Sequence, residues 1–341
     1  MADRFAPRLI NGVFEDPVLF IGFHYEKRAM LFDLGRLDRL SVREILKLSD
    51  VFVSHTHIDH FIGFDHLLRF SLNREQELRL FGPKGFIENI RGKLAGYTWN
   101  LIRDYPLTLV VYEVEGMRMR KAEFKAAHDF RLEGEAISPF SGTLLEEPAL
   151  CVRATVLDHK VPCLAFSLEE LNRFNVKRDV LQAMGINSGP WLNELKTMLR
   201  ENRPRETRLQ IPLSSGGKKE LTLQEWHDLL IVESRGQKIV YVVDNQYNAT
   251  NAERILSLAQ NADLFYCEAF FSQAEEAIAK ERFHLTASQA GLMARQAQAT
   301  RLIPFHFSLR YQAEPDRLKE EALRAFTGSD TEVRGENVPL L

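Results

Sequence analysis

The chain has 341 residues, of which 45% are hydrophobic and 27% are charged, and its formal net charge is -3. This length allows one large α/β domain or two ordinary ones. The nearly balanced charge excludes a polycation, so nucleic-acid binding would require a local basic patch. The three cysteines show no C-x-x-C spacing, which argues against a disulfide framework and fits a reducing cytosol.

Short apolar runs separated by Gly, Asp, Pro or charged residues predict strands. In the first half of the chain they cover residues 8–14, 17–25, 29–35, 50–54, 78–82 and 108–114. Helical apolar spacing predicts helices at 42–48, 58–73 and 85–99. Further strands are expected at 154–170, 238–245, 263–270 and 301–307, and a helix at 287–299. This order favours a layered α/β architecture.

The segment from about 169 to 235 is polar and interrupts this order, with loop signals such as NSGP and PLSSGGKK. Its middle part is rich in cations: Lys196, Arg200, Arg203, Arg205, Arg208, Lys218 and Lys219. We interpret the segment as an insertion in a single domain of residues 1–341. The alternative for the cations is an ordinary solvated surface.

Neither the start of the chain nor any internal run predicts a secretory signal or a membrane span. The first residues, MADRFAPRLING, contain no apolar core, and no apolar run approaches the roughly 18 residues that a membrane helix needs. We therefore expect a cytoplasmic protein without a membrane anchor.

Four metal-ligand side chains follow the strand at 50–54: His55, His57, Asp59 and His60. Imidazoles and carboxylates cost free energy when they are buried without partners, so this density is unfavourable for a core. Both are ligands that Zn²⁺ takes. We interpret His55 and His57 as ligands of one metal, with Asp59 and His60 reaching a second. The alternative is a polar loop that is rich in histidine by chance.

Two metals need about three more protein ligands, and three polar side chains end or interrupt apolar strands farther along the chain. They are His159, Asp244 and His306. Each one alone is a weak candidate, because a single histidine in a strand is more often a hydrogen-bonded core residue. Their order along the chain strengthens the set.

These segments resemble the ribonuclease Z family of tRNA 3′-end processing endonucleases, within the metallo-β-lactamase superfamily. SHTHIDH resembles the signature His-x-His-x-Asp-His, and YVVDN resembles the Gly-Asp-Thr of the family. The other segments that match, in consistent order between about residues 28 and 315, are LDHKVPCLAFSLEE, VLQAMGINSGPWLNELK, DLFYCEAFF, FHLTASQAGLMARQA and LIPFHFSLRY.

The resemblance implies a four-layer αββα sandwich with an inserted arm and two Zn²⁺ per chain, with Mn²⁺ or Fe²⁺ as the other options. It implies that one metal is bound by His55, His57 and His159, the other by Asp59, His60 and His306, and that Asp244 bridges them. A hydroxide that bridges the two metals would attack the phosphodiester of a tRNA 3′ trailer. The family also implies a homodimer.

Three residues receive catalytic roles. The family resemblance assigns Asp59 to orienting the hydroxide and accepting its proton. His284 is the candidate proton donor to the leaving oxygen, because histidine titrates near neutral pH. Glu268 would orient His284 or hold a metal ligand.

The chain departs from the family at several positions. A glycine-rich opening strand is absent, Gly-Glu-Gly is replaced by Gly35, Arg36 and Leu37, and Asn245 and Phe270 stand where the family has threonine. These positions line the substrate groove in the family, so their replacement affects which substrate the chain would accept. The alternative function is therefore a small-molecule hydrolase of a cyclic phosphodiester, a lactone or a thioester. A binding module without catalysis is disfavoured by the full ligand set.

Overall fold

The computed structural model describes residues 3–24, 26–171 and 173–328. These residues form two compact units. The first contains the residues up to 144, residues 153–167 and the residues from 238 onward, and the second contains residues 145–152 and 168–237. Within the described ranges, no helix is long and apolar enough to cross a membrane.

The first sheet has eight strands in chain order: β1 (Phe5–Leu9), β2 (Leu19–Phe23), β3 (Ala29–Phe32), β4 (Leu48–Phe52), β5 (Leu78–Pro83), β6 (Thr108–Glu115), β7 (Arg118–Lys125) and β8 (Leu132–Pro139). Strands β3 to β6 run parallel, while β1–β2–β3 and β6–β7–β8 are antiparallel. The sheet is therefore mixed. β3 is buried along its whole length and β4 nearly so, as expected for a parallel sheet covered on both faces.

The second sheet has six strands in the order β18-β17-β16-β11-β10-β9. They are β9 (Thr143–Glu147), β10 (Leu150–Asp158), β11 (Pro162–Glu170), β16 (Lys238–Val242), β17 (Leu264–Glu268) and β18 (Arg301–Phe305). Strands β16, β17 and β18 run parallel, so their carboxyl ends lie at one edge. The run expected as one strand at 154–170 is two strands, with a turn at 159–161.

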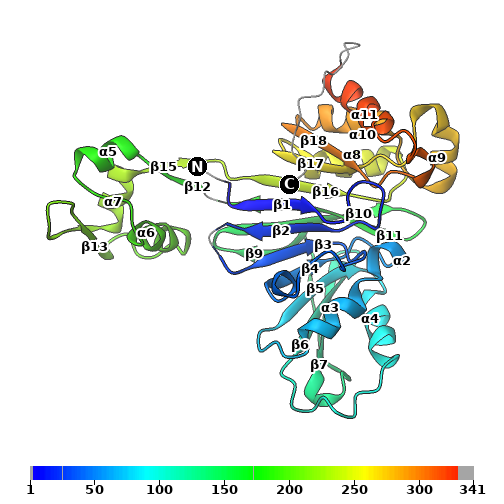
Figure 1. Cartoon of the computed structure of the whole chain (residues 1–341), viewed down its shortest axis with the longest axis horizontal. Helices are drawn as coiled ribbons and strands as arrows, with labels where there is room; N and C mark the ends of the chain where they lie inside the picture. The colour runs from blue at the N-terminus through cyan, green and yellow to red at the C-terminus, as the bar shows by residue number, and fades with distance from the viewer. Residues whose placement is uncertain (1–2, 25, 172, 329–341) are drawn as a thin grey trace. The chain divides into compact units, whose positions relative to one another are not determined.

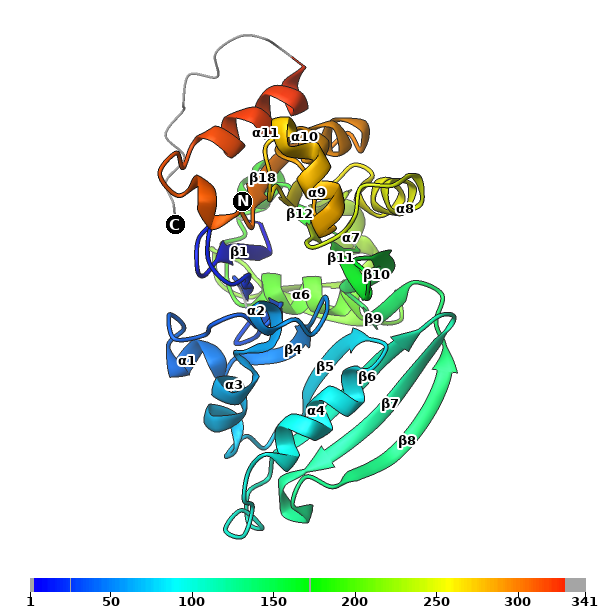
Figure 2. The same cartoon turned by 90° about the vertical axis from the view of Figure 1, so that its right-hand side faces the viewer.

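Helices cover the outer faces of the two sheets. The helices of the first half are α1 (Val42–Ile45), α2 (Ile58–Phe61), α3 (Phe64–Ser71) and α4 (Phe86–Ala95), and α4 packs on β5 and β6 (Figure 2). Those that follow β16 are α8 (Ala249–Ala259), α9 (Glu276–Arg282), α10 (Ala287–Gln296) and α11 (Arg317–Thr327). Helix α8 packs on β16, and α10 packs on β17 and β18 (Figure 1).

Aromatic side chains join the inner faces of the two sheets. The ring of Phe166 in β11 lies 5.5 Å from that of Phe32 in β3 and 5.9 Å from that of Phe52 in β4. Tyr241 in β16 also contacts Phe32, at 5.9 Å. Burial of large aromatic surfaces is a main source of core stability. The result is the four-layer αββα arrangement that the family resemblance implies.

The helix expected at 58–73 is divided into α2 and α3 at Gly63. Gly63 packs closely against the loop after β3. A Cβ atom at this position would lie 2.1 Å from the carbonyl oxygen of Gly35 and 2.9 Å from the side chain of Leu37. Only glycine allows this approach. The division leaves the short helix α2, with three candidate ligands at its start, separate from the longer α3.

The second unit has its own small core. Its elements are β12 (Arg173–Val176), α5 (Arg178–Ala183), α6 (Trp191–Arg200), β13 (Arg208–Pro212), β14 (Lys218–Thr222), α7 (Leu223–Leu230) and β15 (Ile231–Ser234). Trp191 and Trp226 are buried in this core, and the indole nitrogen of Trp226 donates a hydrogen bond to the carbonyl of Leu209. Strands β13 and β14 form a hairpin, and β12 pairs with β15.

Candidate metal centre

The turn after β4 carries the first four candidate ligands. His57 caps the amino end of α2, and Asp59 and His60 lie in its first turn. His55 and His60 are buried, Asp59 is half-buried and His57 is exposed. The turn and the short helix therefore place these four side chains close together, with His55 and His60 on the buried side and His57 on the solvent side.

The other candidates come from the second sheet. Asp244 follows β16, Glu268 is the last residue of β17, and His306 follows β18. They meet because these strands are parallel and adjacent, and ligand sites of α/β proteins collect at such carboxyl ends. His159 lies in the turn between β10 and β11. His306 has a φ of 55°, a backbone conformation that is uncommon for non-glycine residues.

Asp244 lies at the centre of the cluster. Its Oδ2 atom is 3.4 Å from Nε2 of His159, 3.6 Å from Nε2 of His60 and 3.7 Å from Nε2 of His55. Its Oδ1 atom is 2.8 Å from Nδ1 of His306. A carboxylate with imidazoles around both of its oxygens has the arrangement of a bridging ligand.

The structure brings the seven predicted ligands into two groups, and a third group of Asp244, Glu268 and His306 shares one residue with each of them. In each group, one ligand atom from every residue lies within 4.8 Å of the others: His55, His57, His159 and Asp244 in the first, and Asp59, His60 and His306 in the second. In the second group, Oδ2 of Asp59 is 3.5 Å from Nε2 of His60 and 3.6 Å from Nε2 of His306.

Several of these atoms are buried and lack a hydrogen-bond partner: Nε2 of His55, Nε2 of His60, Oδ1 of Asp244 and Nδ1 of His306. The last two are close to each other, but their geometry does not make a hydrogen bond. Unpartnered buried polar atoms are costly, and cations bound within the two groups would satisfy these atoms. Imidazole and carboxylate donors also match zinc chemistry, so the residues fit a metal site.

Residues outside the cluster fix the orientation of its imidazoles. Asp33 is fully buried, accepts a hydrogen bond from the backbone N–H of Ser54 at 2.7 Å, and lies 2.8 Å from Nδ1 of His60. The hydroxyl of Tyr241 donates to the same carboxylate at 3.0 Å. Nδ1 of His159 lies 2.7 Å from the carbonyl oxygen of Phe283. These contacts leave both Nε2 atoms directed at Asp244.

The sequence interpretation missed Asp33 and Tyr241. Asp33 ends the apolar run AMLF, as Asp244 ends its own strand, and that signal could have identified it. Tyr241 lies within a buried strand and gives no such signal. Its contact with Asp33 depends on the packing of the two sheets.

His284 and Glu268 form a pair beside the cluster. Nδ1 of His284 lies 2.9 Å from Oε2 of Glu268. The other oxygen of Glu268 accepts hydrogen bonds from the backbone N–H groups of Asn245 at 2.9 Å and Leu285 at 3.2 Å. Glu268 is fully buried, whereas the His284 side chain keeps 13% exposure. The pair leaves Nε2 of His284 available to a substrate.

Burial and neighbouring charges shift the pKa values of the cluster in opposite directions. Burial, together with the neighbouring His60, lowers the pKa of His55 to about 2. Burial also lowers the pKa of His60, but the carboxylates of Asp244 and Asp33 outweigh it and raise that pKa to about 10. Burial raises the pKa of Asp244, but the surrounding imidazoles hold it well below its usual range. Without a metal, the cluster therefore retains protons that a cation must displace.

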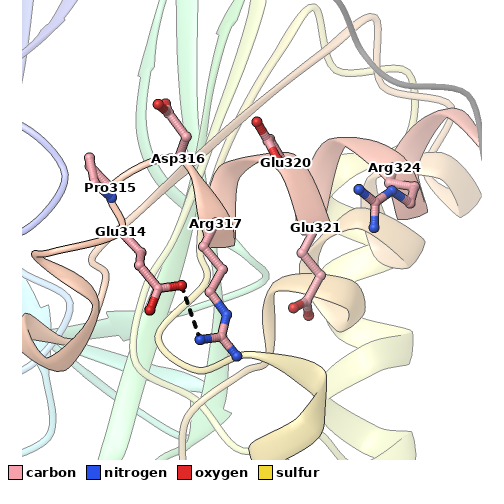
Figure 3. Close-up of a pocket in the computed structure, with 7 residues that line it drawn as sticks. All are labelled: Glu314, Pro315, Asp316, Arg317, Glu320, Glu321 and Arg324. Carbon is pink, nitrogen blue, oxygen red and sulfur yellow. Dashed lines mark hydrogen bonds and ion pairs between the residues drawn. The ribbon is translucent and has the colours of Figure 1, made fainter.

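Two other features lie outside the cluster. His128, an alternative to His159 on sequence grounds, is exposed and pairs with Glu133. A surface hollow of about 530 Å³ at the start of α11 contains none of the candidate ligands (Figure 3). It is lined by Glu314, Pro315, Asp316, Arg317, Glu320, Glu321 and Arg324. Its carboxylates are partly neutralised by arginine, as in the pair of Arg317 with Glu314 at 3.3 Å, so we assign it no chemistry.

Solved structures show the same fold. The short form of human tRNase Z matches with a TM-score of 0.53 at 18% identity, covering 89% of this chain and 93% of that one. The metallo-β-lactamase fold protein YhfI from Bacillus subtilis also gives 0.53, at 15% identity, covering 94% of each chain. The fold is therefore the metallo-β-lactamase fold, as expected. No family model matches the chain.

Curated sequences add the family. A ribonuclease Z from Bacillus subtilis is 26% identical over 313 residues, which are 89% of this chain and 86% of that protein. A ribonuclease Z from Deinococcus radiodurans is 30% identical over 301 residues, which are 87% of this chain and 86% of that protein. Because this identity extends over nearly the whole of both proteins, the chain belongs to the ribonuclease Z family of metal-dependent phosphodiesterases with the metallo-β-lactamase fold.

Proposed function

We propose that the chain holds two Zn²⁺ ions and cleaves the 3′ trailer from precursor tRNA. One ion would be bound by His55, His57 and His159, and the other by Asp59, His60 and His306, with Asp244 between them. The observation that carries this proposal is the convergence of unpartnered buried nitrogen and oxygen atoms around Asp244. Two bound cations would supply a water ionised near neutral pH and would neutralise charge on the attacked phosphate.

Asp59 is the proposed base. Its side chain is 38% exposed, whereas Asp244 is buried, so Asp59 reaches the solvent side of the cluster. Its position near the imidazoles of His306 and His60 keeps it ionised: burial raises the pKa of Asp59, but these two imidazoles outweigh burial and lower that pKa below its usual value. An ionised carboxylate at this place can orient the attacking water and accept its proton.

His284 is the proposed proton donor. Its Nδ1 atom is engaged by Glu268, so Nε2 is the nitrogen that would meet the leaving 3′-oxygen of the substrate. Burial lowers the pKa of His284, but Glu268 and Asp244 outweigh it and raise that pKa. The raised pKa supports a protonated imidazole, which is the form a general acid requires. Glu268 would orient the ring.

The precursor-tRNA substrate is supported by the name ribonuclease Z that the similar proteins carry and by the cations of the insertion at 169–235. Within the second unit, Lys218 and Lys219 are exposed on the β13–β14 hairpin. In contrast, Arg203 pairs with Glu201 at 2.9 Å, and Arg208 has a similar pair. We propose that the two lysines bind the RNA backbone, within a single domain whose inserted arm carries them. The family resemblance also supports a cytoplasmic location and a homodimer. Light scattering can test the homodimer.

The test is to incubate the purified protein with a 3′-extended precursor tRNA and, separately, with bis-p-nitrophenyl phosphate. Cleavage of both substrates, with a mature tRNA 3′-hydroxyl as product, is the expected result. Hydrolysis of the small diester alone would contradict the tRNA substrate and favour a small-molecule hydrolase. Loss of both activities in a catalytically dead control, such as Asp244→Ala, excludes a contaminating nuclease.

A further inference from the structure

Phe270 lies flat against the ring of His284. The two ring centroids are 4.0 Å apart and the planes differ by 10°. Phe270 lies two residues after Glu268, the last residue of β17. Its ring covers His284, the hydrogen-bond partner of the Glu268 carboxylate. Within the described residues, no other aromatic contact of the His284 ring is both as close and as parallel.

Phe270 is itself held in place. Its ring meets the ring of His306 edge-on at 5.2 Å and that of Phe271 at 5.0 Å. Its carbonyl oxygen accepts a hydrogen bond from the backbone N–H of Ser308 at 3.1 Å. It also packs against the buried core formed between β16–β18 and the helices that cover them. Because these contacts hold the Phe270 ring in place, it presents a rigid surface to His284.

The hydrogen bond from His284 to Glu268 and the stacking of Phe270 restrict different movements of the His284 ring. The hydrogen bond fixes Nδ1 but still allows the ring to tilt about that contact. A parallel ring 4.0 Å away blocks the tilt. Nε2 lies across the imidazole ring from Nδ1, which the hydrogen bond holds in place. A small tilt of the ring about Nδ1 therefore moves Nε2 away from its target.

We infer that Phe270 is a positioning residue, which sets the plane of His284 so that Nε2 points at the leaving oxygen. This inference rests on the proposed role of His284. In the reaction, the attacking water gives one proton to Asp59 and forms a bond to phosphorus. The bond from phosphorus to the leaving oxygen breaks, its electron pair stays on that oxygen, and Nε2 of His284 supplies the proton that neutralises it.

The test uses two esters of thymidine 5′-phosphate that differ only in the leaving group. The phenyl ester releases phenolate, a basic leaving group that benefits from protonation. The p-nitrophenyl ester releases p-nitrophenolate, which leaves as a stable anion. Phe270→Leu removes the flat ring but keeps an apolar side chain. It should lower kcat for the phenyl ester roughly tenfold, part of the 10² to 10⁴ that a general acid supplies, and change kcat for the p-nitrophenyl ester little. Phe270→Tyr keeps the flat ring and should restore the phenyl-ester rate.

A double-mutant cycle tests the link to His284. In the His284→Ala background, Phe270→Leu should have no further effect on the phenyl ester, because the group that it positions is gone. Multiplied defects would overturn the inference, as would equal slowing of both esters by Phe270→Leu in protein with full metal content. If Phe270→Leu loses metal, Phe270→Met takes its place in the cycle.

The single variant His284→Ala tests the proposed function separately. If it slows both esters alike, His284 is not the general acid. The cycle still decides whether residues 270 and 284 act as one unit, so the two failures can be distinguished.

Discussion

Asp33 accepts hydrogen bonds from three different parts of the chain and has no direct place in the metal cluster. Ser54, His60 and Tyr241 all meet its carboxylate at 3.0 Å or less. The pairing with His60 keeps Nδ1 of the ring occupied, so that Nε2 is free to bind a metal. Carboxylates in this position typically contribute roughly 10- to 100-fold to metal affinity.

Replacing Asp33 should therefore weaken metal binding without removing a ligand. Asp33→Asn keeps the size of the side chain but loses the negative charge, and we expect zinc affinity to fall about 10- to 100-fold. Competition with a chromophoric chelator measures it. Tyr241→Phe is the matched control, because it removes one hydrogen bond to the same carboxylate and leaves the contact with His60. An equal loss in both variants would mean that the network acts through packing alone.

Substitutions of His306 and His284 should separate a metal ligand from a proton donor. His306→Ala should lose metal, measured by elemental analysis, and activity on every substrate. His284→Ala should keep its metal and lose about 10² to 10⁴ in rate with a substrate whose leaving oxygen needs a proton. Its defect should be small with bis-p-nitrophenyl phosphate. Loss of metal from His284→Ala would instead place this residue among the ligands.

Among the elements, those with strong local patterns were predicted from sequence, and those that depend on distant contacts were not. The central strands β3 to β6 are mostly buried runs, and α10 begins with a capping box between Thr286 and Gln289. In contrast, β7 is rich in charged residues and β8 is largely exposed, and neither was among the predicted strands, because they take their place by pairing toward the sheet edge. The division between α2 and α3 was also missed, since it depends on the approach of Gly63 to the Gly35 loop.

The candidate ligands were found for a related reason. The ligands lie in the segments that follow strands, and the parallel strands β16 and β18 bring Asp244 and His306 to one edge of their sheet. The stacking of Phe270 on His284 could not be predicted in this way, because it depends on side-chain packing between the end of β17 and the start of α10.

The β13–β14 hairpin allows a test of the arm as an element. Reversing Lys218 and Lys219 to Glu should weaken precursor-tRNA cleavage strongly and leave hydrolysis of bis-p-nitrophenyl phosphate unchanged. The salt dependence should also become shallower, by about 0.7 to 0.9 in the log–log slope for each phosphate that the variant no longer neutralises. Reversal of Arg203 and Arg208 is the comparison: each already pairs with a glutamate, so the effect should be smaller. Equal defects on the RNA and the small diester would indicate a structural role for the hairpin.

At the scale of the whole molecule, the candidate ligands come from both sheets. His55 and His60 follow a strand of the first sheet, and Asp244 and His306 follow strands of the second. Bound metal should therefore stabilise the native state as well as catalyse. At a free metal concentration about 1,000 times the Kd, a single site adds about 4 kcal/mol to the free energy of unfolding. We expect about two Zn²⁺ per chain, and a chelator should abolish activity and lower the Tm. Unchanged Tm after complete metal removal would contradict this.

Metal binding should also release protons. The pKa of His60 is raised to about 10, and that of His306 is raised well above its usual value, so both rings hold protons at neutral pH when no metal is present. Protons and metal compete for these nitrogens, so affinity should increase as the pH rises from about 6 to 9. Calorimetry in buffers of different ionisation enthalpy measures the protons released. Binding without proton release would mean that the metal-free cluster is already neutral.

The placement of the ligands along the chain also sets an order of events during synthesis. His55, His57 and His60 leave the ribosome well before His306, which follows β18. Chains fold as they emerge, and contacts between distant residues form late. A nascent chain that ends before β18 has Asp59 and His60 but lacks their third partner. The proposed second metal position therefore stays incomplete until His306 has emerged, and we expect no activity from a nascent chain that ends before β18.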